Sequence, residues 1–381
     1  MNSRRPRPLT QPGNVVNIRD AFLCTPSPQE VEDLIMSALL DRLSTHLFSA
    51  VRVIGVVVVL LCVSANAQTQ HLRLVSTPWS PFTNSQGKAR FALDLVHSAL
   101  QRIGITAETT IVEESRLTPA LLNKEFDGSA ALWTEQQRER VLLYSQPYME
   151  NRLILVGSKN SDVSATSLSA LKGRKIAIVE GYAYGDDVKI GNNEPTYVLT
   201  RGEEDSVAKV LNGDVDYTLM DQLVVEYLIS NYGSDARARL AFGSAPLIKR
   251  SLHFAIRRDF PDAASIISRF NAELRKMIVD KSYNRLLHLE WIEADVDGDG
   301  KVEYVPLTDR PGPNAPEHGY ELFSRSRDVR EPQPSSNSKA RFYFGGKVYQ
   351  GWQSVPDVYK NPEPGNPRSQ GSTITFFHFT F

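Results

Sequence analysis

The feature that most constrains the fold of this chain is a regular alternation of strand-like and helix-like segments between Leu72 and about Trp291. The first series reads "LRLVS", "RFALDLVHSALQRIG", "TAETTIV" and "LTPALLNKE", and apolar residues recur at near-helical spacing from Phe91 to Ile103. A second series starts at Lys172 and reads "RKIAIVEG", "EPTYVLT", "EDSVAKVLNGD", "DYTLM" and "DQLVVEYLISNYG". This rhythm predicts an α/β chain in which mostly parallel sheets are covered by helices.

Two strand-like runs stand outside the two series. "RLILVGSKN" (Arg152 to Asn160) lies between them, and "RSLHFAIRRD" (Arg250 to Asp259) follows the second. We expect these runs to cross between two lobes. The next segment, "DAASIISRFNAELRKMIVDKSYNRLLHLEW", carries two helical patterns that would pack back on the first lobe.

Composition separates this folded middle from the end of the chain. The 381 residues are 23% charged and 41% hydrophobic with a formal net charge of -1, which suits two packed domains and offers no excess charge for nucleic acid. Beyond Tyr304 the chain is rich in Pro, Ser and charge, so we expect poor order and no packed core there. The final alternation of Phe377, Phe379 and Phe381 is compatible with a strand of unknown role.

An export signal precedes the folded region. Arg52 is followed by an apolar run from Val53 to Val63 and by Ala65-Asn66-Ala67, the small-x-small pattern cut by signal peptidase. A membrane span needs roughly 20 apolar residues, about twice the length of this run. We therefore expect cleavage near Ala67, rather than a retained anchor, and a mature chain that begins near Gln68.

The segment before the export signal is unusually long for a leader, and Met36 would open a leader of ordinary length. We therefore expect translation to begin at Met36. Cys24 and Cys62 both lie upstream of the cut, so the mature protein would carry no thiol or disulfide.

Motifs in the first series point to a known family. "TEQQRERVLLYSQPY" resembles the Thr-x-x-Arg helix start followed by an aromatic-Ser-x-Pro-Tyr strand of the periplasmic solute-binding proteins of family 3. Counting back seven residues from Ser145, as the family spacing requires, selects Arg138. One additional residue separates Thr134 from Arg138 compared with the usual pattern, and Arg140 is the alternative.

Motifs in the second series extend the resemblance. "LKGRKIAIVEGYAYGDDV" resembles the family's strand that ends in a glycine loop, and "VLNGDVDYTLMDQLVVEYLI" resembles the strand whose last residue, here Asp221, is an acidic ligand contact. The resemblance covers about Leu72 to Trp291 and implies a two-lobed type II periplasmic binding fold. Each lobe would hold a mostly parallel sheet flanked by helices, with two crossing strands as the hinge.

This fold implies a division of the chain into six parts. They are a leader with a signal peptide (1–67), the first part of lobe 1 (68–155), lobe 2 (156–250), a return to lobe 1 (251–294), a calcium-loop-like segment (295–306), and a Pro/Ser-rich linker with an aromatic tail (307–381).

The resemblance implies a polar amino acid as ligand, and its chemistry suits the two matched residues. Burying an ammonium or a carboxylate without a partner costs several kcal/mol, so an enclosed site needs one group of each sign. Arg138 offers a planar fork that grips a carboxylate with two N–H bonds, and Asp221 would accept the ammonium. Because one residue lies on each lobe, ligand would favour the closed state.

Other residues are further ligand-contact candidates. Trp79 and Phe82 follow the first strand, where the family often places an aromatic ring against the ligand, although core packing explains them as well. Trp133 ends the run that is rich in hydroxyl groups in the family, and Tyr182 stands where the family usually has Ser or Thr. These departures remove polar partners for an amino-acid headgroup, so a different small polar or aromatic ligand is the alternative. Arg116 is a second candidate anion contact.

Simpler roles remain open for the two central residues. Arg138 on an exposed helix could pair with Glu135 or Glu139, and Asp221 could cap the helix that begins at Gln222.

The function implied by the resemblance is that of a monomeric, non-enzymatic receptor, with no required cofactor, that delivers solute to the membrane permease of an ABC importer. The alternative is a dehydratase-like enzyme on the same scaffold, for which Glu113, Glu114 and Glu180 are acid–base candidates. A transglycosylase would need a further catalytic domain after Trp291, and a sensor would need a second span and a cytoplasmic module; the sequence provides neither.

A separate motif, "DVDGDGKVEYVP", matches much of a calcium-binding loop. The candidate ligands are Asp295, Asp297, Asp299, the carbonyl of Lys301, and Glu303. Pro306 replaces the usual twelfth-position glutamate, so we expect at most weak Ca²⁺ binding, with Asp309 the nearest substitute carboxylate. An acidic turn without metal is the alternative.

Overall fold

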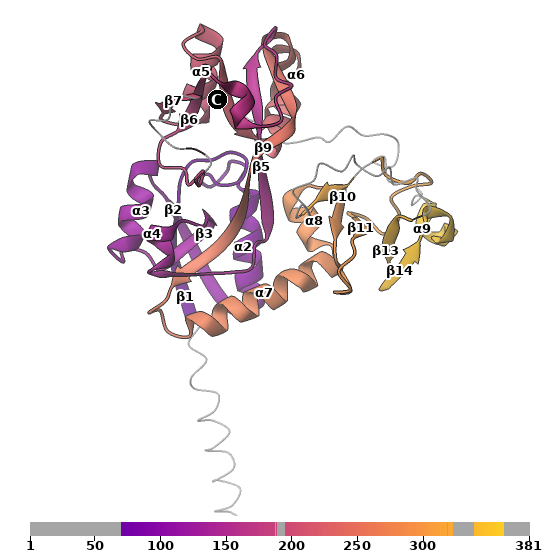
Figure 1. The fold of residues 1–381 in the computed structure, drawn as a ribbon. Coiled ribbons are helices and arrows are strands. Elements are labelled where there is room, and N and C mark those ends of the chain that lie inside the picture. Colours follow the sequence, from indigo (N-terminus) through magenta and orange to yellow (C-terminus); the bar gives the residue numbers. More distant parts are fainter. Residues whose placement is uncertain (1–69, 187, 189–194, 318, 323–338, 362–381) are drawn as a thin grey trace, which may run out of the picture. The chain divides into compact units, whose positions relative to one another are not determined.

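A computed structural model describes residues 70–186, 188, 195–317, 319–322 and 339–361, and all of its elements belong to one unit, Thr69–Phe381. Nine strands form one sheet in the order β2-β1-β3-β9-β5-β8-β6-β7, with β4 beside β9 (Figure 1). Their bounds are β1 Gln70–Ser76, β2 Ile105–Ile111, β3 Gly128–Trp133, β4 Leu142–Tyr144, β5 Met149–Ser158, β6 Lys175–Val179, β7 Thr196–Thr200, β8 Tyr217–Asp221 and β9 Leu240–Arg257.

Lobe 1 is built on three parallel strands, because β1 pairs in parallel with both β2 and β3. Helix α2 (Phe91–Arg102) joins β1 to β2, and its buried face includes Leu95 and Leu100, as the helical spacing predicts. Helices α3 (Glu114–Leu122) and α4 (Gln136–Glu139) follow β2 and β3.

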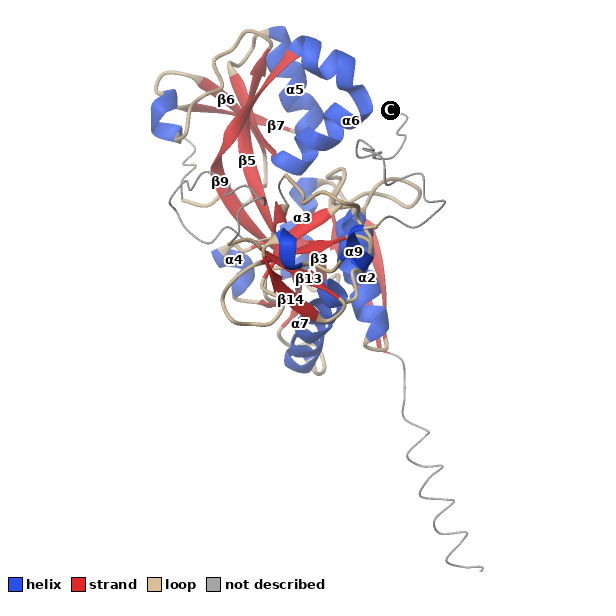
Figure 2. Ribbon diagram, turned by 90° about the vertical axis from the view of Figure 1, so that its right-hand side faces the viewer, coloured by secondary structure: helices blue, strands red, loops and turns tan. Residues whose placement is uncertain are grey.

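Lobe 2 repeats this arrangement, with β6 pairing in parallel with β7 and β8. A short 3₁₀ helix, η1 (Leu168–Leu171), precedes β6, and helices α5 (Glu203–Asn212) and α6 (Gln222–Arg239) pack against the strands (Figure 2). The type II periplasmic binding architecture expected from the sequence is confirmed, with a mostly parallel sheet in each lobe.

The long strands β5 and β9 join the lobes. They run antiparallel to each other from Met149↔Leu252 to Ser158↔Leu240; β9 also pairs with β3 of lobe 1, and β5 with β8 of lobe 2 (Figure 1). The two lone strand-like runs in the sequence are therefore parts of the two crossing strands.

After β9 the chain returns to lobe 1. Helices α7 (Ala263–Val279) and α8 (Ser282–Leu287) contact α2, and Phe270 of α7 is fully buried against Phe254 of β9, with ring centroids 4.8 Å apart. Truncating a buried phenylalanine typically costs about 3–5 kcal/mol, so these helices contribute strongly to the stability of lobe 1.

The sequence interpretation was wrong for part of the segment after Tyr304. Residues 339–361 belong to a second, five-stranded sheet in the order β12-β10-β11-β13-β14. Its elements are β10 Trp291–Ala294, β11 Glu303–Pro306, β12 Tyr320–Glu321, β13 Arg341–Phe344, β14 Lys347–Gln350, η2 Trp352–Ser354 and α9 Asp357–Lys360.

Aromatic side chains form the core of this second sheet, although the segment as a whole is polar in composition. Phe342 and Phe344 are fully buried, and Phe342 stacks on Tyr304 with ring centroids 5.4 Å apart. Gly345 and Gly346 both have positive φ in the two-residue turn between β13 and β14, a conformation that glycine adopts readily. The predicted strand at the final phenylalanines lies outside the described residues.

The second sheet contacts the crossing strand β5 through β12. The hydroxyl of Tyr320 donates to the carbonyl of Glu150 (3.0 Å), and the guanidinium of Arg152 lies 5.1 Å from the centre of the Tyr320 ring. Arg152 also donates to the carbonyl of Glu321.

The predicted leader also lies outside the described residues. Among the residues that the structure does describe, no helix has the length and apolar character needed to cross a membrane.

Candidate ligand site between the lobes

The carboxyl ends of parallel strands from both lobes supply the candidate site. In lobe 1, β1 runs into the loop that carries Trp79, and β3 ends at Trp133. In lobe 2, β6 runs into the loop with Tyr182, and β8 ends at Asp221. Ligands of open α/β sheets generally bind outside the carboxyl ends of the strands, so this junction is the expected place for one.

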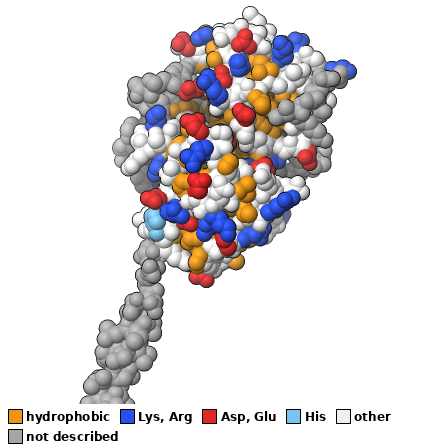
Figure 3. Space-filling view, turned by 90° about the vertical axis from the view of Figure 1, so that its left-hand side faces the viewer, with side chains coloured by type: hydrophobic (Ala, Val, Ile, Leu, Met, Phe, Trp, Pro, Cys, Tyr) orange, Lys and Arg blue, Asp and Glu red, His pale blue; other side chains and the backbone are white. Residues whose placement is uncertain are grey.

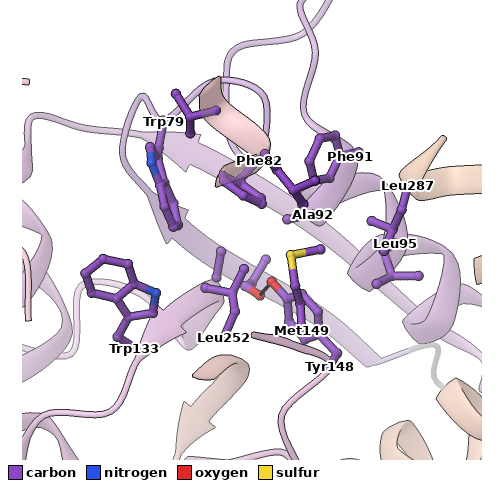
Figure 4. Packing of buried hydrophobic residues seen from close by; sticks show 14 of the residues in the cluster. Trp79, Phe82, Phe91, Ala92, Leu95, Trp133, Tyr148, Met149, Leu252 and Leu287 are labelled. Atoms are coloured by element: carbon purple, nitrogen blue, oxygen red, sulfur yellow. Dashed lines mark hydrogen bonds between the residues drawn. The ribbon is translucent and has the colours of Figure 1, made fainter. Parts of the chain in front are cut away.

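Four rings, which we call the interlobe aromatic cluster, bring the lobes into contact. They are Trp79, Trp133, Tyr182 and Tyr184. Tyr182 lies 5.8 Å from Trp79 and 5.5 Å from Trp133, measured between ring centroids, and Trp79 lies 5.5 Å from Trp133. Figure 4 shows Trp79 and Trp133 at one margin of the buried core. The structure thus brings together three of the ring residues named from the sequence.

Phe82, the fourth predicted ring, has a different position. It is fully buried and contacts Phe91 of α2, with ring centroids 5.0 Å apart, as well as Trp79 at 4.3 Å. It packs behind Trp79, and of the two roles weighed for it, core packing describes these contacts.

Asp221 is buried and bonded on both carboxylate oxygens. Oδ1 accepts from the backbone N–H of Leu223 (2.8 Å) as the N-cap of α6, and Oδ2 accepts from Asn151 Nδ2 (3.1 Å) and the backbone N–H of Arg152 (2.9 Å). Burial raises the Asp221 pKa to about 7 against these hydrogen bonds. The capping role weighed from the sequence is present, and the negative charge of the ionised carboxylate would attract a ligand ammonium.

A hydrogen-bonded path links Asp221 to the aromatic cluster. The indole Nε1 of Trp133 donates to Asn151 Oδ1 (2.8 Å), and Asn151 in turn donates to Asp221. Asn151 is fully buried on β5, so the crossing strand fixes the positions of a lobe 1 ring and a lobe 2 carboxylate together.

Glu203 is a site residue that sequence reasoning missed. It is the first residue of α5, and its Oε2 is buried without a hydrogen-bond partner in the described part of the chain. Burial raises the Glu203 pKa to about 8, and the nearby charge of Asp221 adds to the rise. We call Glu203 and Asp221 the acidic pair. An acidic residue at the start of a helix that follows a strand is common, so Glu203 carries no specific signal in the sequence.

Arg138 is the inward-facing arginine of its helix. Only 3% of its side chain is exposed, whereas Arg140 two residues later is exposed. Its Nε lies 2.7 Å from Glu135 Oε2, and its positive charge lowers the pKa of Glu114, which burial raises overall. The pairing with Glu135 weighed from the sequence is therefore present. A ligand carboxylate would share Arg138 with protein carboxylates or displace one.

Two glycines let side chains of lobe 1 and of the crossing strand β9 approach the loop after β6. Gly181 (φ +87°) and Gly185 (φ +88°) adopt left-handed backbone conformations. A Cβ at Gly181 would lie 2.9 Å from Glu114 Cγ, and one at Gly185 would lie 2.7 Å from Arg250 Nη1. The glycine loop predicted from the sequence is thus where Glu114 of lobe 1 and Arg250 of β9 approach closely.

The structure leaves some candidates away from this junction. The side chain of Arg116 is 63% exposed and bonds Glu125 (3.0 Å), and Glu113 and Glu180 are exposed. Figure 3 shows acidic and basic side chains interspersed over one face of the molecule, where solvent screens each of them. Buried charged groups at the junction, such as Arg138 and Asp221, are therefore better candidates for ligand contacts than these exposed residues.

The calcium-loop motif forms a compact acidic turn. Single carboxylate oxygens of Asp295, Asp297 and Glu303 all lie within 4.8 Å of one another. Asp295 accepts from the backbone N–H groups of Gly298 (2.8 Å) and Gly300 (2.9 Å). Such an oxygen-rich turn is chemically suited to Ca²⁺.

A cation from the chain itself already occupies this turn. Arg341 of β13 donates to both oxygens of Asp299 (2.8 Å each) and to Asp297 Oδ2 (2.9 Å), and its Nη1 lies 3.0 Å from Glu303 Oε1. Ca²⁺ would therefore compete with Arg341. Asp309, the suggested substitute ligand, is paired with Lys281 Nζ (2.5 Å).

Comparison with known families agrees with this architecture. Residues 74–294 match the family model of bacterial extracellular solute-binding proteins, family 3. The chain belongs to this family. The match ends where the second sheet begins, so most of that sheet lies beyond the matched residues.

The curated relatives differ in the share of their length that this chain matches. A probable amino-acid ABC transporter-binding protein of Haemophilus influenzae is 25% identical over 224 residues, which is 57% of this chain and 82% of the relative. The virulence sensor protein BvgS of Bordetella pertussis is 26% identical over 121 residues, which is 32% of this chain and 10% of the sensor.

Among solved structures, an arginine third transport system periplasmic binding protein of Legionella pneumophila shares 23% identity with a TM-score of 0.49. The match covers 57% of this chain and 98% of that structure.

Proposed function

We propose that this family member is a periplasmic receptor that binds an amino acid between its two lobes and delivers it to an ABC importer. The proposal is supported by the family and by the relative named as an amino-acid ABC transporter-binding protein. Export with cleavage near Ala67 is part of the proposal, since the family is extracellular.

The observation that carries the proposal is the placement of buried charge on the two lobes. Arg138 of lobe 1 is a 3% exposed cation, and Asp221 of lobe 2 is a 1% exposed carboxylate at the junction with the aromatic cluster. A ligand with a carboxylate and an ammonium can engage one residue on each lobe, which favours closure about β5 and β9.

The dehydratase-like alternative has less support in the geometry. Of its three acid–base candidates, Glu114 alone approaches the opposite lobe, through the loop at Gly181. Its pKa is raised by burial, which suits an acid, but Thr77 and Arg138 hold its charged form. A residue already paired in this way is better suited to positioning the site.

The test is calorimetric titration of the purified protein with a panel of amino acids and small organic acids. Arg138→Ala and Asp221→Asn should each weaken binding by about 2–5 kcal/mol, which is tens- to thousands-fold, because each leaves a buried ligand charge without its partner. Arg138→Lys should also bind poorly, since a point charge cannot replace the two-pronged fork.

Arg140→Ala is the matched control, because Arg140 lies on the same segment but is exposed. Its affinity should equal that of the wild type. Tight binding that survives Arg138→Ala would refute the arginine site, and turnover of any compound would favour the enzyme alternative.

A further inference from the structure

Two buried polar atoms at the lobe junction lack hydrogen-bond partners among the described residues: the indole Nε1 of Trp79 and Oε2 of Glu203. Trp79 is 8% exposed and comes from lobe 1, whereas Glu203 opens α5 in lobe 2. The indole N–H acts on the Glu203 carboxyl group as a weak hydrogen-bond donor and lowers its pKa, so this long contact joins the two atoms across the lobes. A carboxylate can accept several hydrogen bonds, and buried capacity left unused is costly, so Glu203 can still take a further partner.

The surroundings of Glu203 show the sign of that partner. The groups that shift its pKa are Asp221 and Trp79, and neither is a cation. Burial raises the pKa of Tyr182 and of Tyr184, and the charges of Glu203 and, from lobe 1, of Glu114 add to the rise. In the described residues, Glu203 therefore faces carboxylates, phenols and an indole, and the pKa shifts reveal no lysine or arginine beside it.

The rings of the interlobe aromatic cluster reinforce this preference. Trp79, Trp133 and Tyr182 lie within 5.8 Å of one another between centroids. Aromatic faces attract ammonium and guanidinium groups, more strongly when water is excluded. The acidic pair and the rings together make a site in which a second positive charge on the ligand gains two kinds of stabilisation.

We propose, resting on the proposed amino-acid receptor function, that Glu203 is a specificity residue that selects amino acids with a cationic side chain. In this scheme the ligand's α-ammonium lies on Asp221 and its side-chain ammonium or guanidinium lies on Glu203. Without ligand the acidic pair retains a proton. On binding, the carboxyl O–H bond breaks, the proton passes to solvent, and the carboxylate forms an ion pair with the ligand.

Calorimetry with arginine and with citrulline, its neutral near-isostere, tests the selection at pH 7. The wild type should bind arginine about 30- to 1,000-fold more tightly than citrulline, because the neutral side chain of citrulline cannot form the ion pair with Glu203. Glu203→Gln should bring the two ligands to within about threefold of each other. Glu204→Gln, the same change at the exposed neighbouring residue of α5, should behave like the wild type.

The proton supplies a second measurement on the same protein. The difference in heat between titrations of the wild type with arginine in phosphate and in Tris should reveal protons released on binding. Glu203→Gln should release fewer protons, because its amide does not titrate and Asp221 alone remains.

The outcomes separate the two proposals. Equal affinity of the wild type for arginine and citrulline, or an arginine preference that persists in Glu203→Gln, would overturn the role of Glu203 while leaving the receptor function intact. Failure of every amino acid to bind would overturn both. The comparison of arginine with citrulline uses the wild-type protein alone, so it stays valid even if a variant does not fold.

Discussion

The acidic pair and the loop from Asp295 to Glu303 are both clusters of carboxylates, but they are balanced in different ways. In the loop, the guanidinium of Arg341 contacts Asp297, Asp299 and Glu303. In the acidic pair, burial raises the pKa of both carboxyls. A cluster neutralised by its own chain is complete without a ligand. A cluster whose carboxyl groups are neutralised by protons can instead release those protons when a cationic ligand binds.

The two regions also differ in how strongly the sequence marks them. The loop carries a recognisable metal motif, yet the chain supplies its cation from a strand about 40 residues away. Glu203 carries no motif, yet its carboxyl group is buried at the junction of the lobes with an unpaired oxygen. Motif strength therefore does not measure how much a site needs a ligand, whereas the balance of buried charge does.

The largest effect should come from removing the cation of the loop. Arg341→Ala leaves Glu303, which is fully buried, facing two aspartates without a cation, and should lower the free energy of unfolding by about 2–4 kcal/mol. Urea unfolding would measure this. Arg174→Ala, which breaks an exposed pair with Asp216, should cost less than about 1 kcal/mol. Equal losses in the two variants would mean that the loop does not depend on Arg341.

A smaller effect of opposite sign should follow from neutralising the acidic pair. The folded-state pKa values of Glu203 (about 8) and Asp221 (about 7) lie above their ordinary values of 4.5 and 3.8. The folded state thus keeps protons that the unfolded chain loses. Their contribution is fully present below about pH 4 and is lost as pH rises through about 8.

Glu203→Gln should therefore match the wild type near pH 4.5 and exceed its unfolding free energy by about 1–3 kcal/mol at pH 8.5. Unfolding at a series of pH values would show this difference. His97 and His253, whose pKa values burial lowers, titrate in both proteins and cancel in the comparison. A difference that does not change with pH would contradict the protonated pair.

The smallest effect concerns Ca²⁺. With Arg341 in place, millimolar Ca²⁺ should raise the melting temperature by less than about 1 °C, but in Arg341→Ala it should raise it by about 2–4 °C, because the freed carboxylates can then bind the ion. Adding Asp297→Ala to the variant should remove the response. If Arg341→Ala responds to Ca²⁺ equally with and without Asp297→Ala, the loop is not a metal site.

Much of the fold was predictable because local pattern and global architecture agree. The alternating segments became β1 to β3 and β6 to β8 with their helices, and the two lone runs became parts of β5 and β9. The second sheet was missed because its strands are short and lie among Pro- and Ser-rich segments. Their stability comes from contacts between distant residues, such as Tyr304 with Phe342, which no local window contains.

The sequence by itself determined most, but not all, of the side chains at the lobe junction. Family spacing and strand ends selected Arg138, Asp221, Trp79, Trp133 and Tyr182, but not Glu203. Tertiary structure alone decided how these groups are balanced. It buried Arg138 beside Glu135 and placed Glu203 beside Asp221. It also set Arg341 on the acidic loop. The physical reason is that solvation and pairing determine the energy of a charge, and both depend on neighbours that only folding brings together.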